Sequence, residues 1–380
     1  MSSGLEGLRL GYFLNSGSFF LSHFAHVASY ANQLGADVTV VAPEDDSSVA
    51  IRDAGFRLVH IRLPRLSRDP IDGARTVYTL ERIYRRERLQ LVHHITAKAV
   101  ICGSIAARLA GDLATVNSIT GLGYAFALQS RAQLLRLGLS LAYRIALKVS
   151  RGDLIFENHD DFALFRSLGV TGVETAVIVP GTGVDCERFT PAPRPPGVPA
   201  FAFIGRMVRD KGFLEFLKAA SLIRDREAPV RLIAIGGVDP GNPTSLGERD
   251  LADQCAEAGV EHLGFRSDIA AELALIHGIV LPSWREGFPR VLQEAAASGL
   301  PAITTDVPGC REAIIDGETG ILVPPRDHYA LAGAIFELAQ SQAVRERMGC
   351  AARELALRSF NADTIVPEIV RCYRRALSRR

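Results

Sequence analysis

The sequence lacks the patterns that mark common metal and cofactor sites. Its six cysteines are widely spaced and form no C-x-x-C pair, so we expect free buried thiols rather than a zinc site or a disulfide framework. No apolar run is followed by G-x-G-x-x-G, because G-L-G at 121–123 is too short to count, and a dinucleotide-dependent oxidoreductase is disfavoured. No D-x-D motif flanks a strand-like run, so we expect no metal and no organic cofactor.

Long hydrophobic runs are also absent. A membrane-spanning helix needs roughly 18 uninterrupted apolar residues, and the nearest approach, 134–149, is interrupted by Arg136, Arg144 and Lys148. The first residues, MSSGLEGLRLGYFL, contain no basic segment followed by an apolar one, so a secretory signal peptide is not expected. We expect a cytoplasmic protein, either free or bound peripherally to the inner face of the cytoplasmic membrane.

The composition is that of an ordinary globular protein, but the charge is unevenly distributed. Hydrophobic residues make up 48% and charged residues 22% of 380 residues, and the net charge of +1 gives no reason to expect a nucleic-acid partner. Residues 51–148, however, hold sixteen Lys and Arg against six Asp and Glu. A basic zone of this kind attracts phosphate-bearing partners or an anionic membrane, although solvated helix faces give the same count.

Short apolar runs alternate with longer amphipathic segments in both halves of the chain. This alternation is typical of a parallel sheet whose strands are joined by crossover helices. The sequence therefore predicts an α/β fold with two doubly wound, Rossmann-like domains facing a central cleft, and ligands bound beyond the carboxyl ends of the strands. The expected strands are 8–14, 37–43, 56–61, 89–94, 114–119, 153–158, 200–205, 231–237, 260–265, 278–283, 301–306 and 320–325.

A proline-rich stretch is predicted to separate the two domains. Residues 190–200, TPAPRPPGVPA, contain five prolines, which resist both a helix and a central strand, and we interpret them as a stiff linker. The predicted domains are 1–190 and 191–360. We expect the last segment, 361–380, to form a helix that crosses back to the first domain.

The most informative stretch, P-S-W-R-E-G-F-P-R-V-L-Q-E-A at 282–295, begins as a strand ends and runs into a helix. Glu286 lies in the loop, where a carboxylate can accept hydrogen bonds from sugar hydroxyls, and Glu294 lies further along the helix. Unpaired amides at the start of a helix form an anion site suited to a diphosphate. The helix dipole alone also favours glutamates at this position.

A second loop, G-R-M-V-R-D-K-G at 205–212, directly follows another predicted strand. Its two cations, Arg206 and Lys211, can converge on one diphosphate, because a guanidinium fork and an ammonium point charge both suit phosphate oxygens. We expect the intervening Arg209 and Asp210 to be solvated or paired with each other.

Together these motifs resemble glycosyltransferase family 4, a retaining family with the two-domain GT-B fold. The order is G-R-x(4)-K-G, then G-G, then E-G-F-x(5)-E-A, then D-G-E-T-G-I-L-V-P-P, and the match covers about 201–330. The segment V-I-V-P-G-T-G-V-D-C-E-R-F at 177–189 is similar to the one that closes the family's first domain. V-N-S-I-T-G-L-G at 116–123 resembles the acceptor-side loop of a subgroup that builds glycans on polyprenyl diphosphate.

The resemblance implies catalytic and binding roles for individual residues. Arg206 and Lys211 match the pair that holds the nucleotide diphosphate and stabilises the departing charge. Glu286 matches the glutamate that faces the donor sugar, as a positioning group rather than a nucleophile, and Glu294 matches the one that binds the ribose. The other implied nucleotide-binding positions are Gly17, Gly287, Phe288 and Pro289.

The acceptor side departs from the family pattern. Many relatives carry a histidine in the acceptor-side loop at the position of either Thr120 or Ile119 in this chain. Two histidines, His93 and His94, instead end the preceding predicted strand, 89–94, and Lys98 follows a few residues later. We therefore consider a role for His94 or Lys98 near the acceptor phosphate, against the alternative that a histidine at a strand end is structural.

The resemblance implies retaining transfer of a hexose or N-acetylhexosamine from a nucleotide sugar, with UDP as carrier by the subgroup likeness. The implied acceptor is a glycan on polyprenyl diphosphate, in polysaccharide or glycoconjugate biosynthesis. A UDP-N-acetylglucosamine 2-epimerase-like enzyme and a non-catalytic nucleotide-sugar-binding scaffold remain alternatives. The E-G-F-x(5)-E-A loop favours the transferase over the epimerase. The presence of all four charged residues of the motifs argues against the scaffold; these are Arg206, Lys211, Glu286 and Glu294.

Three basic segments are candidates for contact with an anionic membrane: 79–90, 130–151 and 371–380. Residues 130–151 place apolar residues at helical spacing among cations, as a helix lying on a lipid surface does. A helix packed on the sheet with its polar face in water has the same periodicity. The final segment, RCYRRALSRR, is either a solvated terminus or a further lipid contact.

Overall fold

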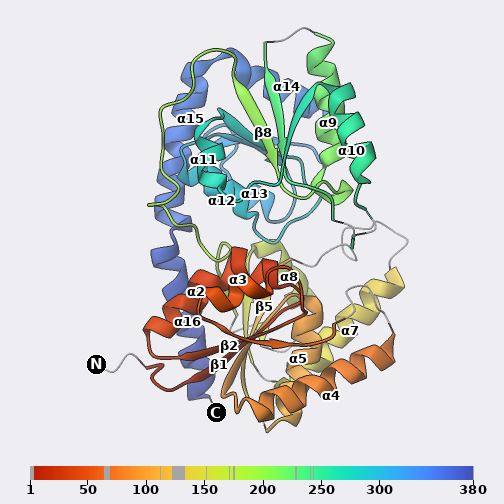
Figure 1. Ribbon diagram of the computed structural model, residues 1–380, viewed down its shortest axis with the longest axis vertical. Helices are drawn as coiled ribbons and strands as arrows, with labels where there is room; N and C mark the ends of the chain where they lie inside the picture. Colours follow the sequence, from red (N-terminus) through yellow and green to blue (C-terminus); the bar gives the residue numbers. More distant parts are fainter. Residues whose placement is uncertain are drawn as a thin grey trace. The chain divides into compact units, whose positions relative to one another are not determined.

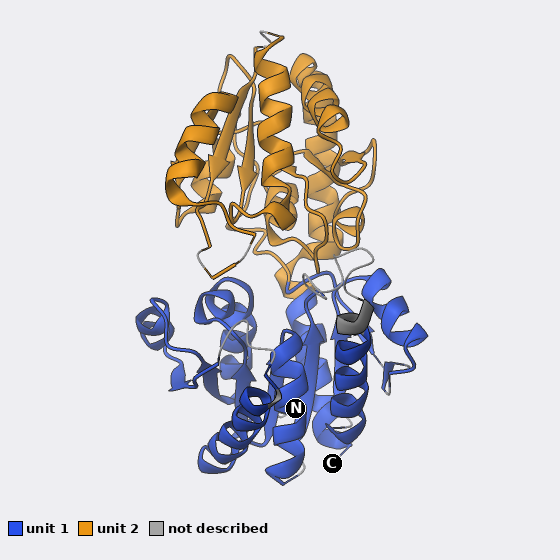
Figure 2. Cartoon of the chain, turned by 90° about the vertical axis from the view of Figure 1, so that its right-hand side faces the viewer, with its two compact units in different colours: residues 1–182, 365–380 blue, residues 183–364 orange. Residues whose placement is uncertain are grey.

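The chain folds into two compact α/β units. A computed structural model describes residues 4–63, 69–111, 113–121, 133–150, 152–170, 172–173, 176–226, 229–239, 241–242 and 244–379. One unit comprises Met1–Thr182 with Ile365–Arg380, and the other comprises Gly183–Thr364 (Figure 2). Each unit contains one sheet whose neighbouring strands run parallel (Figure 1), so the prediction of two doubly wound α/β domains is confirmed.

The first unit is built on a seven-stranded sheet with the order β3-β2-β1-β4-β5-β6-β7. The chain order reverses between the neighbouring strands β1 and β4, which makes this pair the topological switch point. The elements are β1 (Arg9–Phe13), α1 (Gly17–Phe19), a π-helix (Phe20–Phe24), α2 (Ala25–Gln33), β2 (Asp37–Ala42), α3 (Ser48–Asp53), β3 (Arg57–His60), α4 (Pro70–Arg86), β4 (Leu91–Ile95), α5 (Ala97–Leu109), β5 (Ala114–Ile119), α7 (Gln133–Ser150), β6 (Asp153–Phe156), α8 (His159–Ser167), β7 (Val177–Ile178) and, at the end of the chain, α16 (Ala362–Ser378).

Both faces of this sheet are covered, which explains why β4, β5 and β6 are buried at every position. Helices α4, α5 and α7 pack side by side on one face (Figure 1), where their buried residues share two apolar clusters with the strands. The other face carries the segment after β1 and the helix α16. Successive residues of one strand therefore point to different layers: His93 contacts Tyr373 of α16, whereas the ring of His94 lies against Tyr84 of α4.

The second unit has a six-stranded sheet with the order β10-β9-β8-β11-β12-β13 and one continuous core. Its switch point lies between the neighbouring strands β8 and β11. The elements are β8 (Ala200–Ile204), a 3-10 turn (Arg209–Lys211), α9 (Phe213–Arg224), β9 (Arg231–Ile235), α10 (Glu248–Ala258), β10 (Val260–Gly264), α11 (Ile269–Ala274), β11 (Gly278–Leu281), α12 (Arg290–Ala297), β12 (Ala302–Thr305), α13 (Cys310–Ala313), β13 (Gly320–Val323), α14 (His328–Gln340), α15 (Gln342–Leu355) and a π-helix (Ala356–Phe360).

The proline-rich stretch is not a linker between the units, which corrects the sequence interpretation. The unit boundary falls before it, between Thr182 and Gly183. Within the stretch, the Arg194 guanidinium donates to the Leu273 carbonyl at 3.0 Å, and the Pro195 carbonyl is hydrogen-bonded to a ring nitrogen of His277 at 3.0 Å. The prolines therefore stiffen a segment that is anchored on the second unit.

The end of the chain belongs to the first unit and is anchored there by ion pairs. Asp153, at the start of β6, is fully buried, and its two carboxylate oxygens accept from Arg375 at 2.7 Å and from Arg379 at 2.5 Å. Cys372, Tyr373 and other apolar residues of α16 are buried. These arginines are therefore committed to the protein, and the structure gives no support to a lipid contact at residues 371–379.

Tyr373 links α16 to the sheet through a buried polar network. Its hydroxyl lies 2.8 Å from Nδ1 of His93 and 2.8 Å from the hydroxyl of Tyr12. Tyr373→Phe leaves these two buried groups without a partner, and we expect it to lower the free energy of unfolding by about 1–3 kcal/mol. Urea denaturation measures this loss. The control is Tyr329→Phe, at a side chain that is 68% exposed; equal stability of both variants would contradict the network.

Candidate functional site

The candidate site lies at the carboxyl edge of the second sheet, at its switch point. β8 and β11 are neighbouring strands that run parallel, so the loops that follow them emerge side by side. The loop after β8 carries Arg206 and Lys211, and the loop after β11 carries Glu286. The two sequence motifs, far apart along the chain, are therefore brought to one place.

Gly212 allows the two loops to touch. Its φ of 73° lies in the left-handed region, and a Cβ built on it would fall 1.9 Å from the carbonyl oxygen of Pro282. No side chain fits there, so glycine is required on both conformational and steric grounds. The neighbouring N–H of Trp284 donates to the carbonyl of Asp210 at 2.9 Å, which ties the same loops together again.

Lys211 and Glu286 form an ion pair at this contact. The Lys211 Nζ lies 2.5 Å from Oε1 of Glu286, and the hydroxyl of Ser283 donates to the same oxygen at 2.6 Å. The side chains are only 23% and 11% exposed, respectively, so the pair is screened less by water than a surface pair. An ammonium group has three donors, so Lys211 can hold Glu286 and still donate to a ligand.

Arg206 lies on the exposed side of the same loop. Its guanidinium pairs with Asp239, which follows β9, at 2.6 Å, while more than half of its side chain remains in solvent. Burial raises the pKa of the Asp210 carboxyl above its ordinary value. The nearby charges of Arg206 and Lys211 act in the opposite direction but do not outweigh burial. The expectation that Asp210 is solvated or paired with Arg209 is wrong, because this carboxyl is half-buried among the site's charges.

Trp284 and Arg326 extend the site in a way that the motifs do not indicate. The Arg326 guanidinium stacks over the Trp284 ring at 4.1 Å from its centroid, a cation–π geometry. The indole N–H of Trp284 donates to Glu215 at 3.3 Å. Arg326 also holds a φ of 65°, which is uncommon for a residue other than glycine. The single tryptophan of the chain, lying inside the informative loop, was a signal that could have identified this position.

The loop before α12 approaches another backbone closely. The N–H of Glu286 donates to the Pro308 carbonyl at 3.2 Å, and a Cβ on Gly309 would fall 2.3 Å from the carbonyl oxygen of Gly287. Phe288 turns its ring into the core, 5.3 Å from the ring of Phe360. At Phe288 only the main chain is thus left to meet a ligand. Pro289 is the N-cap of α12, and no side chain caps this helix start.

Glu294 lies one turn into α12 and is bonded within the helix. Its Oε1 accepts from Nε of Arg290 at 2.7 Å, and its side chain is largely buried. Burial raises the pKa of Glu294, while the charge and hydrogen bond of Arg290 act in the opposite direction. The role of Glu294 toward a ribose stays a prediction.

Gly17 follows β1 at the switch point of the first unit, but its amide is already bonded. The Gly17 N–H donates to Oδ2 of Asp45 at 3.0 Å, and a Cβ at this position would fall 2.2 Å from Oγ of Ser47. Close packing against the loop after β2 is thus enough to require glycine. The approach of this backbone to a diphosphate stays a prediction.

His94 is a structural residue, which corrects the hypothesis that it lies near the acceptor. It has no exposed surface, and its ring nitrogens are hydrogen-bonded to Asn117 at 2.8 Å and to Tyr84 at 3.2 Å. Burial lowers the pKa of His94 to about 4, so the ring stays neutral near pH 7. Since a Cβ on Gly103 would fall 2.4 Å from the ring, His94 also sets the closest approach of α5 to the sheet.

The other acceptor-side residues lie at the carboxyl ends of β4 and β5. Lys98 is half-buried in the first turn of α5, and Thr120 directly follows β5, while the rest of the acceptor-side loop, from 122 onward, falls outside the described residues. Thr96, which the motifs did not single out, has φ 80° and ψ 158°, a combination ordinarily confined to glycine. Nothing in the local sequence indicates this strain.

Two family models match the chain, one in each half. Residues 198–341 match "Glycosyl transferases group 1", and residues 9–158 match "Glycosyl transferase 4-like". The chain is 24% identical over 384 residues to the N,N'-diacetylbacillosaminyl-diphospho-undecaprenol alpha-1,3-N-acetylgalactosaminyltransferase of Campylobacter jejuni, covering 97% of this chain and 99% of the relative. It is 25% identical to the UDP-Gal:alpha-D-GlcNAc-diphosphoundecaprenol alpha-1,3-galactosyltransferase of Escherichia coli, covering 89% and 88%.

Solved structures share the fold over the whole chain. A sucrose-phosphate synthase from Thermosynechococcus elongatus aligns with a TM-score of 0.81 at 20% identity, covering 98% of this chain and 100% of that one. HepE from Anabaena, solved with UDP and glucose, aligns with a TM-score of 0.75 at 18% identity, covering 96% and 99%. At these identities the likeness concerns the fold, which is the GT-B arrangement of two parallel-sheet domains.

We expect Gly212→Ala to disrupt the site from the backbone. The added Cβ overlaps the Pro282 carbonyl and strains a left-handed φ, so the free energy of unfolding should fall by at least about 1–3 kcal/mol. Denaturant unfolding measures this. The matched control is Gly333→Ala in α14, where no atom beyond the neighbouring backbone of the helix lies within 4 Å of the new methyl group. This control should be neutral or slightly stabilising; a Gly212→Ala variant as stable as the control would contradict the close approach.

Proposed function

Because the chain belongs to the group 1 glycosyltransferases, with a glycosyl transferase 4-like N-terminal half, we propose that it moves a hexose or an N-acetylhexosamine from a UDP-sugar to a glycan on polyprenyl diphosphate. The observation that carries this proposal is the Lys211–Glu286 pair at the switch point of the second sheet. It places an ammonium and a carboxylate side by side, beside the uncapped start of α12. The ammonium suits a diphosphate, and the carboxylate suits a sugar ring on which positive charge develops.

The chemistry of transfer matches these groups. The bond between the sugar C1 and the diphosphate oxygen breaks, C1 bonds to the acceptor hydroxyl oxygen, and the hydroxyl proton passes to the departing phosphate on the same face. Lys211 and Arg206 stabilise the charge that grows on the diphosphate, and Glu286 positions the sugar and stabilises its oxocarbenium character. Attack and departure on one face retain the anomeric configuration, and no covalent nucleophile is required.

The choice of donor and acceptor follows the relatives. The E. coli enzyme is named for UDP-galactose, and the HepE structure holds UDP. The C. jejuni and E. coli enzymes are both named for acceptors on an undecaprenol diphosphate carrier. For this chain we propose UDP as the carrier of the donor sugar and polyprenyl diphosphate as the carrier of the acceptor glycan. We propose that the reaction takes place at the cytoplasmic face of the membrane, in polysaccharide or glycoconjugate biosynthesis.

We also propose that transfer needs no metal ion. Two cations on one loop, with the positive end of α12 nearby, can neutralise a diphosphate without Mg²⁺. Transfer rather than epimerisation is favoured because the C. jejuni and E. coli relatives are both transferases.

We expect Lys211→Ala and Glu286→Gln each to reduce the rate of sugar transfer by about tenfold to a hundredfold, because each removes charge stabilisation that develops in the transition state. A radiolabelled UDP-sugar and a lipid-linked acceptor provide the assay. Glu286→Gln keeps the shape of the side chain and removes only its charge, so it separates electrostatics from packing.

The matched control is Arg231→Ala, which breaks an exposed ion pair with Glu261 on the same unit. Exposed pairs contribute little to stability, so this variant should transfer sugar at the wild-type rate. Unchanged rates in both site variants, with all proteins folded, would contradict the placement of the site.

A further inference from the structure

Exposed apolar side chains gather on one helical layer of the first unit. The described part of the chain has thirteen large hydrophobic residues that are exposed, and six of them lie on α4, α5 and α7. These helices have only 17, 13 and 18 residues in a chain of 380. The six side chains, each between 51% and 67% exposed, are Ile71, Tyr78, Leu109, Leu137, Leu141 and Ile145.

The spacing of these residues gives each helix an apolar outer stripe. On α7, Leu137, Leu141 and Ile145 recur every four residues, so they lie along one side of the helix. On α4, Ile71 and Tyr78 are two turns apart and also share a side. The inner residues of α7 pack in the core, so this stripe is a second apolar face rather than part of the first.

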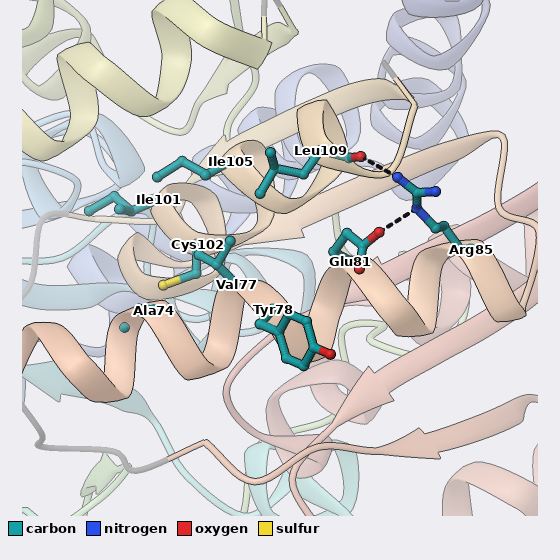
Figure 3. Close-up of a pocket in the computed structure, with 10 residues that line it drawn as sticks. Ala74, Val77, Tyr78, Glu81, Arg85, Ile101, Cys102, Ile105 and Leu109 are labelled. Carbon is teal, nitrogen blue, oxygen red and sulfur yellow. Dashed lines mark hydrogen bonds and ion pairs between the residues drawn. The ribbon is translucent and has the colours of Figure 1, made fainter.

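Between α4 and α5 the surface is hollowed into an apolar groove with a cavity volume of about 690 Å³. Figure 3 shows Val77 and Ala74 of α4 facing Ile101 and Ile105 of α5, with the carbon side chains forming the walls. At one end the Arg85 guanidinium pairs with Glu81 and donates to the Leu109 carbonyl at 2.8 Å (Figure 3). The groove is therefore apolar inside with a cation at its rim.

The charge on the three helices has one dominant sign. Their sequences contain nine Lys and Arg against two Asp and Glu, in a chain whose net charge is +1. On α7, Arg144 and Lys148 are exposed next to the apolar stripe, and the helix carries no acidic residue. On α4, the Arg82 guanidinium lies 5.7 Å from the centre of the Tyr78 ring. Apolar and cationic groups are thus interleaved over one surface.

We propose that this outer face of α4, α5 and α7 docks the protein on an anionic lipid bilayer, with the apolar stripes and the groove taking up lipid hydrocarbon and the cations meeting the headgroup phosphates. Helices that lie in the plane of the interface combine these features. Among the described residues, no helix is long and apolar enough to cross a membrane. The docking surface itself is inferred from the exposed side chains. Only its purpose, bringing the enzyme to an acceptor held in the membrane, rests on the proposed function.

A bilayer fits this face better than a second copy of the chain. In a symmetric dimer the same patch meets itself, so the clustered arginines and lysines of the two copies would face one another. An anionic bilayer instead supplies the opposite charge over the whole area. In the other basic candidate, residues 371–379, Arg375 and Arg379 are held by the buried carboxylate of Asp153.

Vesicle sedimentation tests the proposal on the full-length protein. Wild type should partition at least about tenfold more strongly onto vesicles of equal parts phosphatidylcholine and phosphatidylglycerol than onto phosphatidylcholine alone, because each cation near an anionic surface changes the partition about fivefold. The double variant Leu141→Glu/Ile145→Glu should lose at least about tenfold of this binding. Arg144→Glu/Lys148→Glu should lose a similar amount while keeping the apolar stripe.

The matched control is Leu275→Glu, at a leucine of the second unit that is 59% exposed, and it should bind like wild type. Equal binding by wild type and both double variants, or no binding by wild type, overturns the proposal. A wild-type dimer that Leu141→Glu/Ile145→Glu converts to a monomer in size-exclusion chromatography, without vesicle binding, would make this face a contact between copies and overturn it as well.

Transfer to a short-chain acceptor in solution separates this inference from the proposed function. The double variants should keep the wild-type rate there, because no bilayer is involved. Normal transfer without vesicle binding overturns the docking surface and leaves the function standing. Vesicle binding by wild type without any transfer supports the surface and contradicts the function.

Discussion

The contact between two backbone loops at the carboxyl edge of the second sheet is the constraint on which the site depends. Gly212 brings the loop after β8 against the Pro282 carbonyl, and this approach sets Lys211 beside Glu286. The main chain therefore brings the two loops together, and the ion pair and the Ser283 hydroxyl hold the Glu286 carboxylate there. An ammonium and a carboxylate that are held in this way need little reorganisation when charge develops on a substrate, which is the condition for electrostatic catalysis.

The two units use the same topology for different purposes. In the second unit, the loops at the switch point carry the charged side chains of Arg206, Lys211 and Glu286. In the first unit, the corresponding strand ends carry Gly17 and the strained Thr96, while His93 and His94 are buried on opposite faces of the sheet. One face is closed by α16, which the buried Tyr373 network holds in place. The other face is covered by the three helices whose outer surface is apolar and basic.

The sequence predicts most of the fold because strands buried on both faces read as short apolar runs, and parallel topology then places their ends. Lys211 and Glu286 could be identified because they lie in loops with a specific residue order. Asp210 could not be assigned correctly, because its burial depends on the loop from β11, far along the chain. The two alternatives for His94 could not be separated from sequence, because the Tyr84 side chain that covers its ring comes from α4. The prolines of 190–200 did not indicate the surface on which this segment is anchored.

Calorimetric titration with UDP, GDP, ADP and NAD, each with and without magnesium, tests whether the site at Lys211 binds the nucleotide of a sugar donor. We predict that UDP binds without a need for the metal, and that Lys211→Ala loses at least about tenfold in affinity, since a charge-assisted contact to phosphate is worth about 1.5–3 kcal/mol. Selective binding of GDP would contradict the proposed donor and keep the class of reaction. Absence of binding to any of the four nucleotides would contradict the assignment of this site to a nucleotide sugar.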